Sequence, residues 1–284
     1  MSDEEDKKRL GDAVVPPPPS LGASVSSVPL RSGRAPEGTR SGYGLATRIG
    51  DEDRTRVWET DEIPWRMICS LTGLSGGQEI LVGTGALIAP RVILTAGHNF
   101  DPRVKEIDIA PARSGEERPY GAKRVGRAGF RMHPAWENTA LRDPSRDAGV
   151  IILDEPFQGL EKEWFAIAAP PDDALAGWML NIAGYPKASP DNDDARGAEL
   201  WFHANAIEKA KAQTIAYSID TTVGQSGAPV WVDPGGGSVP TIVGIHAYGA
   251  PPKLPPGLPQ DDRFNSATRI DDDLATHIRG WMPQ

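Results

Sequence analysis

The apolar positions of the chain fall into short runs separated by turn-forming residues. The segment "EILVGTGALIAPRVILTAGH" at 79–98 holds two apolar runs divided by glycines, then Pro90, then a third run. Runs of this length bounded by glycine and proline indicate strands joined by turns. The same character recurs at residues 147–156, 178–186, 214–222 and 241–249.

Helical periodicity is nearly absent before the C-terminus. In "DDDLATHIRGWM" (271–282) an aspartate N-cap precedes Leu274, Ile278 and Trp281, which share one helical face. Glycine (31) and proline (27) make up about a fifth of the 284 residues, which suits short strands and turns. The pattern predicts an all-β fold, either one domain or a pair of barrels, with a C-terminal helix packed outside.

Residues 1–46 differ in composition from the remainder. They are rich in proline, serine and glycine and have no aromatic residue before Tyr43. Such a segment cannot bury enough apolar surface to offset its ordering entropy, so we expect a disordered tail or a removable pro-segment. The start, "MSDEEDKKRLGDAVV", lacks the apolar core of a secretory signal. This favours the cytoplasm by default and leaves a leaderless route out of the cell open.

Charge and cysteine content exclude several classes of function. The net charge of −9 argues against a nucleic-acid partner. Cys69 is the only cysteine, which excludes an internal disulfide and a cysteine-based zinc site. The chain has no uninterrupted run of 18 apolar residues, so we expect no membrane-spanning helix. The acidic segment 189–197 lacks a complete EF-hand pattern and is interpreted as a solvated loop. We expect no metal and no cofactor.

Three residues could form a nucleophilic site. His98 ends an apolar strand, Asp147 begins the apolar run "DAGVIIL", and Ser226 lies in "GQSGAP". Each has a plain alternative on its own: a structural histidine, a turn residue at a strand start, and a small residue in a tight turn. The α/β-hydrolase elbow is excluded because Ala228 stands where its second glycine belongs. The chain order is histidine, aspartate, serine, which is the chymotrypsin order.

Gly224, which lies two residues before Ser226, could serve in catalysis. Gly224 leaves its backbone N–H open to close approach, and the N–H groups of Gly224 and Ser226 could form an oxyanion hole. One such donor is worth roughly 3–4 kcal/mol in the transition state. Gly227 permits the tight turn that presents the serine.

From about Ile49 onward, the chain resembles the chymotrypsin-like serine peptidases, specifically their bacterial glutamyl-endopeptidase branch. The matching motifs are "IGDEDRTRV", "GTGALIAPRVILTAGH", "RDAGVIIL", "IAGYP", "YSIDTTVGQSGAPV" and "IVGIHAYG". The resemblance implies a peptidase domain at 47–284 made of two six-stranded antiparallel β-barrels, roughly 47–160 and 161–284. It implies a serine endopeptidase acting on polypeptides, which we expect to be a monomer.

The resemblance also implies the role of each residue in the site. His98 would be the general base, Asp147 would orient it, and Ser226 would attack the scissile carbonyl. In the glutamate-specific branch, a histidine and a threonine at the positions of His246 and Thr221 bind the substrate carboxylate. Both can donate hydrogen bonds to an acid. A core histidine satisfied by the backbone is the plain alternative for His246.

Two features leave alternatives open. Asp220 lies six residues before Ser226, where trypsin-type enzymes place the aspartate that attracts Arg or Lys, although the glutamate-specific branch also carries "IDT" here. Trypsin-type activation needs an aspartate immediately before the serine, but that residue is Gln225. We therefore expect a different processing route, with a chain trimmed between Glu37 and Ile49 more active than the full chain. A non-catalytic peptide-binding homologue is the other alternative.

Overall fold

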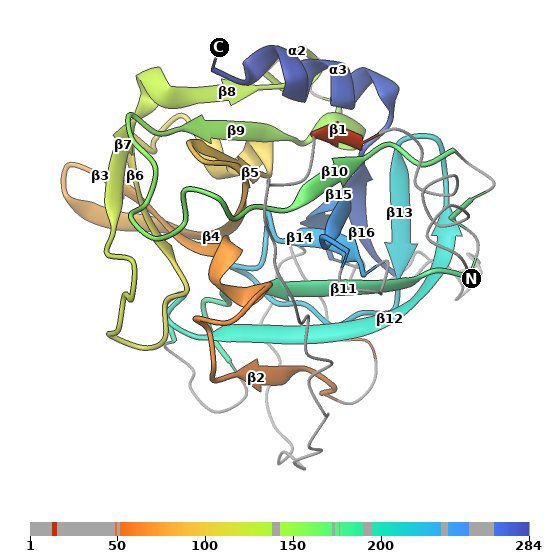
Figure 1. Ribbon diagram of the computed structural model, residues 1–284, viewed down its shortest axis with the longest axis horizontal. Coiled ribbons are helices and arrows are strands. Elements are labelled where there is room, and N and C mark those ends of the chain that lie inside the picture. The colour runs from red at the N-terminus through yellow and green to blue at the C-terminus, as the bar shows by residue number, and fades with distance from the viewer. Residues whose placement is uncertain are drawn as a thin grey trace, which may run out of the picture.

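The computed structural model describes residues 13–15, 49, 52–137, 143–171, 174–175, 177–189, 195–233, 238–249 and 264–283. The described residues form two antiparallel-dominated β-sheets, which lie side by side in Figure 1. Nearly all of the first sheet comes from the N-terminal half of the chain, and most of the second comes from the C-terminal half.

The first sheet has seven antiparallel strands. Their order across the sheet is β7 (Lys123–Gly126), β6 (Glu106–Pro111), β3 (Ile68–Ser75), β4 (Gln78–Ala89), β5 (Val92–Thr95), β9 (Gly149–Ile152) and β8 (Phe130–Met132). No strand pairing among the described residues joins β7 to β8, so this sheet is an open half-barrel.

The second sheet contains a closed ring. Its members are β15 (Thr241–Tyr248), β14 (Pro229–Val232), β11 (Met179–Gly184), β12 (Leu200–Ala210), β13 (Thr214–Tyr217) and β16 (Asn265–Arg269). Pairing of β16 back onto β15 closes the six strands into a barrel. Three short strands add to it: β10 (Ala166–Ala168) on β15, β1 (Ala13–Val15) on β10, and β2 (Thr55–Val57) on β12.

Helices are short apart from the last. They are α2 (Pro134–Glu137), α3 (Asp272–Trp281) and the 3₁₀ turns η1 (Trp65–Met67), η2 (Gly97–Phe100), η3 (Arg127–Gly129) and η4 (Pro144–Arg146). The Asp271 carboxylate caps α3 by accepting the Leu274 N–H at 3.0 Å. Leu274 and Ile278 are fully buried, and α3 lies over β9 at the top of Figure 1. The predicted helix and its buried face are confirmed.

The core follows from the apolar runs read in the sequence. In β15, seven of the eight residues are buried, as a strand enclosed on both faces requires. Ile182, Tyr217, Val230 and Val243 pack together inside the closed barrel. Each fully buried side chain of this size contributes roughly 1.5–3 kcal/mol.

The predicted fold class is confirmed, with differences in detail. The first sheet is an open half-barrel of seven strands, where a six-stranded barrel was expected. Short strands such as β7 carry no apolar run that would reveal them in the sequence. The expected strand at 214–222 ends at Tyr217. Strand β1 falls inside 1–46, and the other residues of 1–46 lie outside the described part of the chain, so the tail or pro-segment stays a prediction.

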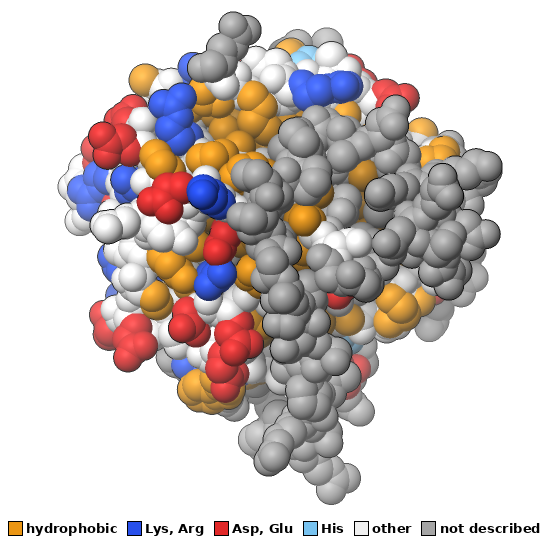
Figure 2. Space-filling view, viewed as in Figure 1, with side chains coloured by type: hydrophobic (Ala, Val, Ile, Leu, Met, Phe, Trp, Pro, Cys, Tyr) orange, Lys and Arg blue, Asp and Glu red, His pale blue; other side chains and the backbone are white. Residues whose placement is uncertain are grey.

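The surface has mixed charge where the first sheet is visible. Figure 2 shows acidic and basic side chains interspersed over the left of this face. Residues 190–194 of the acidic segment 189–197 lie outside the described part of the chain. The helices in the described residues include none long and apolar enough to cross a membrane.

Candidate active site

The structure brings His98 and Asp147 together. His98 lies in η2 directly after β5, and Asp147 precedes β9, the strand paired with β5. The Asp147 carboxylate is fully buried, and it accepts the His98 backbone N–H at 2.8 Å and the ring Nδ1–H at 2.6 Å. Two bonds from one residue fix the ring orientation and place the proton on Nδ1, which leaves Nε2 as the acceptor.

The loop of Ser226 has the backbone that its glycines permit. Gly224 has φ +102° and Gly227 has φ +86°, both in the region that favours glycine. A Cβ on Gly227 would lie 2.1 Å from Thr95 Oγ1, and one on Gly224 would lie 2.5 Å from the Lys187 nitrogen. The turn expected to present Ser226 therefore depends on these two positions having no side chain.

The first sheet holds the backbone of Ser226. The Ser226 carbonyl accepts the Thr84 N–H at 2.9 Å and the Asn99 side-chain amide at 3.0 Å. Asn99 follows His98 directly, so this bond ties the loop that carries Ser226 to the turn that carries His98. In the described part of the chain, His98 Nε2 is buried and has no hydrogen-bond partner, so no bond joins it to the Ser226 hydroxyl in this structure. Such contacts are often long before substrate binds.

His246 and Thr221 present two unpaired polar atoms. His246 is fully buried in β15, and its Nδ1 lies 2.7 Å from the hydroxyl of Tyr217, which is also fully buried. His246 Nε2 and Thr221 Oγ1 have no partner among the described residues. Burial, followed by repulsion from His98, lowers the pKa of His246 to about 3, so the ring is neutral at ordinary pH.

Asp220 points towards the N-terminal segment. Its carboxylate is buried and accepts the backbone N–H groups of Ile49 at 2.6 Å and Asp53 at 3.2 Å. Its own N–H donates to His203 Nδ1 at 2.9 Å. Burial raises the pKa of the Asp220 carboxyl, and the two backbone donors oppose that shift.

Sequence reasoning missed three residues that support this site: Tyr217, Asn99 and Arg54. Asn99 could have been noticed because it is polar and follows His98. Tyr217 lies 29 residues from His246 along the chain, and Arg54 lies 171 residues from its partner Gln225. Local patterns contain no signal for pairs so far apart.

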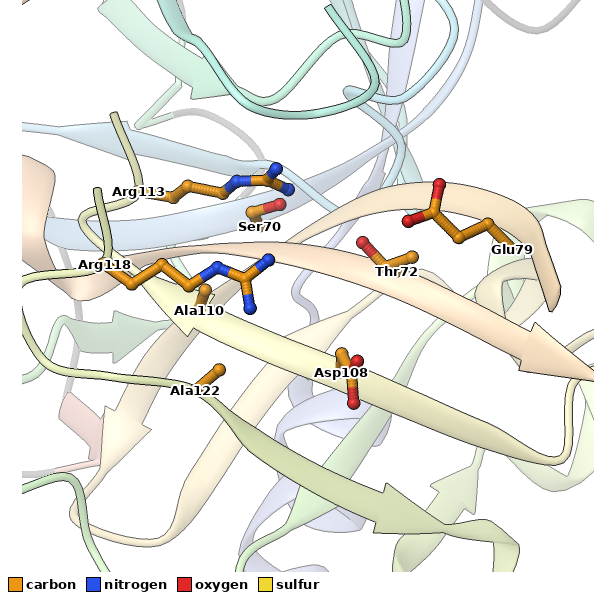
Figure 3. Close-up of a pocket in the computed structure, with 8 residues that line it drawn as sticks. All are labelled: Ser70, Thr72, Glu79, Asp108, Ala110, Arg113, Arg118 and Ala122. Atoms are coloured by element: carbon orange, nitrogen blue, oxygen red, sulfur yellow. The ribbon is translucent and has the colours of Figure 1, made fainter. Parts of the chain in front are cut away.

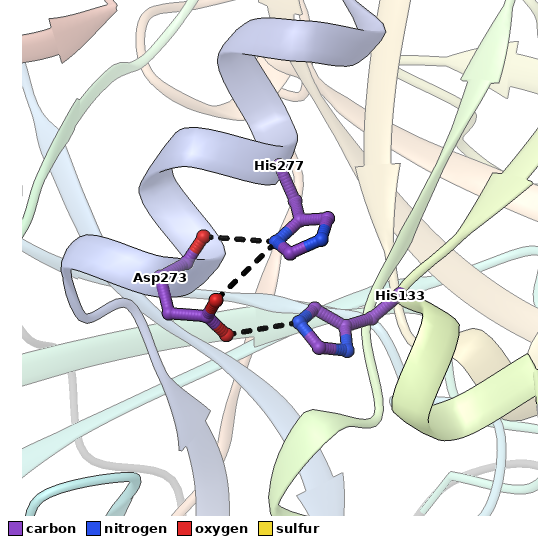
Figure 4. Close-up of side chains that lie close together, drawn as sticks. All are labelled: His133, Asp273 and His277. Carbon is purple, nitrogen blue, oxygen red and sulfur yellow. Dashed lines mark hydrogen bonds and ion pairs between the residues drawn. The ribbon is translucent and has the colours of Figure 1, made fainter.

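A second histidine cluster lies outside this site. Figure 4 shows Asp273 of α3 beside the neighbouring rings of His133 and His277. Asp273 Oδ2 is 3.0 Å from His133 Nε2, and the His277 Nδ1–H donates to the Asp273 carbonyl at 3.0 Å. Because the Ala135 N–H donates to His133 Nδ1, the proton of neutral His133 is on Nε2, facing the carboxylate. The contacts therefore fasten α3 to the turn after β8.

A polar pocket lies on the first sheet, away from the residues described above. Figure 3 shows Arg113 and Arg118 extending into it side by side. Partial burial, and then the charge of Arg118, lowers the pKa of Arg113. The lining residues are Ser70, Thr72, Glu79, Asp108, Ala110, Arg113, Arg118 and Ala122.

Comparison with known proteins agrees with the resemblance seen in the sequence. A family model described as Trypsin matches residues 55–261. A glutamyl endopeptidase of Bacillus licheniformis is 27% identical over 247 residues, spanning 84% of this chain and 70% of that protein. An extracellular metalloprotease of Bacillus subtilis is 26% identical, over 83% of this chain and 70% of that protein.

Solved structures share the fold. A Glu endopeptidase in complex with MPD has a TM-score of 0.66 at 23% identity, covering 82% of this chain and 98% of that one. Protease Anisep from Arthrobacter nicotinovorans has a TM-score of 0.57 at 16% identity, covering 78% and 97%. The name of the Bacillus subtilis relative places that protein outside the cell, so the relatives give the cytoplasmic default no support. With most of its length matched by the family model, the chain belongs to the Trypsin family and is a serine endopeptidase of chymotrypsin-like fold.

Proposed function

We propose that this endopeptidase acts through His98, Asp147 and Ser226 and cleaves polypeptides after glutamate, with aspartate a poorer substrate. One observation carries the specificity: Thr221 Oγ1 and His246 Nε2 are both fully buried and have no partner in the described part of the chain. Both belong to the segments that hold Ser226. Thr221 lies five residues before it, and the His246 carbonyl accepts the Gly227 N–H at 2.8 Å.

The proposed chemistry begins at His98 Nε2. This nitrogen takes the proton from the Ser226 hydroxyl as Oγ bonds to the scissile carbonyl carbon. Asp147 stabilises the imidazolium through the 2.6 Å bond to Nδ1. The imidazolium then gives its proton to the departing amine as the C–N bond breaks, which leaves an acyl-enzyme. His98 then takes a proton from a water molecule as the water oxygen bonds to the acyl carbon. It returns that proton to Ser226 Oγ as the ester bond breaks, which releases the new carboxylate and restores the serine.

The backbone around Gly224 suits an oxyanion hole. The Val223 carbonyl accepts the Lys187 N–H at 2.7 Å. In a trans peptide the C=O and N–H point in opposite directions, so the Gly224 N–H points away from Lys187. Within the described residues, the N–H groups of Gly224 and Ser226 donate to no protein acceptor. Both therefore remain available for the developing oxyanion.

Tyr217 supports His246 as a hydrogen-bond donor to the substrate. Burial raises the pKa of the Tyr217 phenol well above its ordinary value, so the hydroxyl keeps its proton. When Tyr217 donates to Nδ1, the neutral imidazole has its proton on Nε2. This N–H and the Thr221 hydroxyl can both donate to a carboxylate. We expect glutamate to reach these donors better than aspartate, which is shorter by one methylene.

The contacts of Asp220 favour glutamate over arginine or lysine. Both carboxylate oxygens already accept backbone N–H groups, from Ile49 and Asp53. These contacts turn the carboxylate towards the N-terminal segment, and a substrate cation would have to compete with both donors. Cleavage of a peptide library tests the specificity. Cutting confined to sites after arginine or lysine would refute the proposed preference.

Trimming of the N-terminal segment is proposed to raise activity. The Ile49 nitrogen lies 2.6 Å from Asp220 Oδ1. In the intact chain this nitrogen is a neutral amide, but a cut after Arg48 would convert it to an ammonium group. The new charge would offset Asp220, whose negative charge opposes binding of an acidic substrate. Arg48 itself lies outside the described residues. Equal kcat/KM for full-length and trimmed protein on a glutamyl peptide would contradict this proposal.

Labelling with a fluorophosphonate tests the triad. We expect wild-type protein to be labelled at Ser226 and to cleave glutamyl peptides, and Ser226→Ala to lose both. The missing bond between His98 Nε2 and Ser226 is the one observation that favours a non-catalytic peptide-binding homologue. Trimmed wild-type protein that neither labels nor cleaves would favour that alternative.

A further inference from the structure

A buried cation lies beside residues 222–227, the loop that carries the proposed nucleophile Ser226 and is called the nucleophile loop below. This cation has no part in the chemistry above. The Arg54 side chain is 2% exposed. Its Nε and Nη2 donate to the two oxygens of Glu52 at 2.6 and 2.7 Å. Desolvation makes a buried ion pair costly, and it stabilises little by itself. The remaining nitrogen of the guanidinium therefore matters most.

This nitrogen, Nη1, donates to two side chains of the nucleophile loop. It lies 2.6 Å from Thr222 Oγ1 and 2.9 Å from Gln225 Oε1. Gln225 Oε1 also accepts the Thr222 N–H at 2.9 Å. Thr222 and Gln225 bracket Val223 and Gly224. The guanidinium thus joins the two ends of the short segment that carries the proposed oxyanion donor.

Other segments hold the middle of this loop. The Gly224 carbonyl accepts the Thr84 hydroxyl at 2.9 Å, and the Val223 carbonyl accepts the Lys187 N–H. These bonds set the direction of two peptide planes, but they do not hold the side chains of Thr222 and Gln225. The Gln225 N–H closes the turn on the Thr222 carbonyl at 3.0 Å, and the Thr222 hydroxyl donates to the Ala188 carbonyl at 3.4 Å. Arg54 adds one group that holds both side chains together, from the segment preceding β2.

We propose that Arg54 is a positioning residue that keeps the Thr222–Gln225 loop, and with it the Gly224 N–H, in the catalytic conformation. This inference rests on the proposed oxyanion donors. Because Glu52 neutralises the guanidinium locally, Arg54 acts through geometry and does not select the charge of the substrate. Its loss should lower kcat by the same factor whatever residue precedes the scissile bond. A small displacement of a catalytic group costs on the order of 10- to 100-fold.

The test compares Arg54→Met with Arg56→Met. Arg56 lies in β2, two residues after Arg54. Its guanidinium is 3.3 Å from Glu199 and stacks 3.8 Å from the centre of the Trp58 ring. Among the described residues, no contact joins it to the nucleophile loop. We measure kcat and KM on glutamyl and glutaminyl peptides, expressed per folded enzyme from tryptophan fluorescence. Arg54→Met should lose roughly 10- to 100-fold in kcat on both peptides, and Arg56→Met should stay within about twofold of wild type.

Two further variants keep the inference falsifiable if Arg54→Met folds poorly. Arg54→Lys keeps the charge beside Glu52 but cannot bridge Glu52, Thr222 and Gln225 together, so its kcat should fall to an intermediate value. The losses in kcat caused by Arg54→Met and Gln225→Met should be non-additive in the double variant, because both changes remove the same contact between Nη1 and Oε1.

The outcomes separate this inference from the proposed function. A kcat for Arg54→Met within twofold of wild type, or a loss confined to glutamyl peptides, would overturn the positioning role. An equal loss in Arg56→Met would overturn it as well. Activity retained in Ser226→Ala would instead overturn the proposed nucleophile, and the oxyanion assignment with it.

Discussion

Replacing Tyr217 with phenylalanine should weaken the preference for glutamate. The change removes one oxygen and leaves the buried ring in place. It also removes the 2.7 Å hydrogen bond to His246 Nδ1. Nδ1 then becomes a buried polar atom with no partner among the described residues. Without the Tyr217 donor, nothing holds the proton of the neutral ring on Nε2. The tautomer with the proton on Nδ1 then becomes accessible, and it turns a lone pair of Nε2 towards the substrate carboxylate.

The size of the effect follows from the bond at stake. A hydrogen bond to a charged group contributes about 1.5–3 kcal/mol, which corresponds to about 10- to 150-fold in an equilibrium or rate ratio. Only part of the His246 population changes tautomer, so we expect kcat/KM on a glutamyl peptide to fall about tenfold. A glutaminyl peptide lacks the carboxylate, and its kcat/KM should change by less than about twofold.

Tyr185→Phe is the matched control. Tyr185 is likewise fully buried, but its hydroxyl has no hydrogen-bond partner in the described part of the chain. The assay is the ratio of kcat/KM on glutamyl and glutaminyl peptides, together with the ¹⁵N shifts of the His246 ring, which report its tautomer. If Tyr217→Phe keeps the ratio within twofold of Tyr185→Phe, or leaves the ring shifts unchanged, Tyr217 does not set the donor.

Three further changes test other parts of the site. Asp147→Asn should lower kcat by about 10³- to 10⁴-fold with little change in KM, because a neutral amide at this position can no longer hold the proton on Nδ1 of His98. Steady-state kinetics at about pH 8 measure the loss in kcat. A loss below tenfold would contradict the proposed role of Asp147 in orienting His98. Gly227→Ala should destabilise the protein by more than about 2 kcal/mol, since φ is +86° and the new Cβ would clash with Thr95; urea unfolding checks this, and Gly76→Ala, at φ +57° with open space around it, is the control. The pKa of His246 is near 6.5 in the unfolded chain but about 3 in the folded protein. Between these pH values the unfolded state binds the extra proton. The free energy of unfolding is therefore full above about pH 6.5 and falls towards pH 3 by up to ~1.4 kcal/mol per pH unit. His246→Gln should flatten that slope in urea titrations from about pH 4 to 7, and an unchanged slope would show that other groups produce it.

The sequence predicted the elements whose apolar runs are long and enclosed. Strands β4, β5 and β15 lie where their runs of Val, Ile and Leu stand. Strand β12 was missed because nine of its eleven residues are only partly buried or exposed, and its second half carries Glu208 and Lys209. Such a strand is recognisable only from its pairing partners, which a local pattern does not contain.

The candidate site divides in the same way. The sequence predicted His98, Asp147 and Ser226 because the first two flank apolar runs, the third lies in a glycine-flanked turn, and together they follow a known order. The orientation of Asp220 could not be predicted, because its partner Ile49 lies 171 residues away. The same holds for the contact that satisfies His246 Nδ1. In both cases local sequence identifies the polar residue, but only the folded chain decides which of its atoms remains free.

Three separate parts of the chain hold the loop that carries Ser226 in place. Thr84 of the first sheet and Asn99 of the turn η2 hold the Ser226 carbonyl, and His246 of the closed barrel holds Gly227. The segment before β2 holds Gln225 through Arg54. This segment precedes the first sheet in the chain, but the strand β2 that follows it pairs with the second sheet. No one of these parts fixes the loop alone, since each bonds a different residue of it. Catalytic geometry should therefore depend on docking of the segment before β2 as well as on the two sheets.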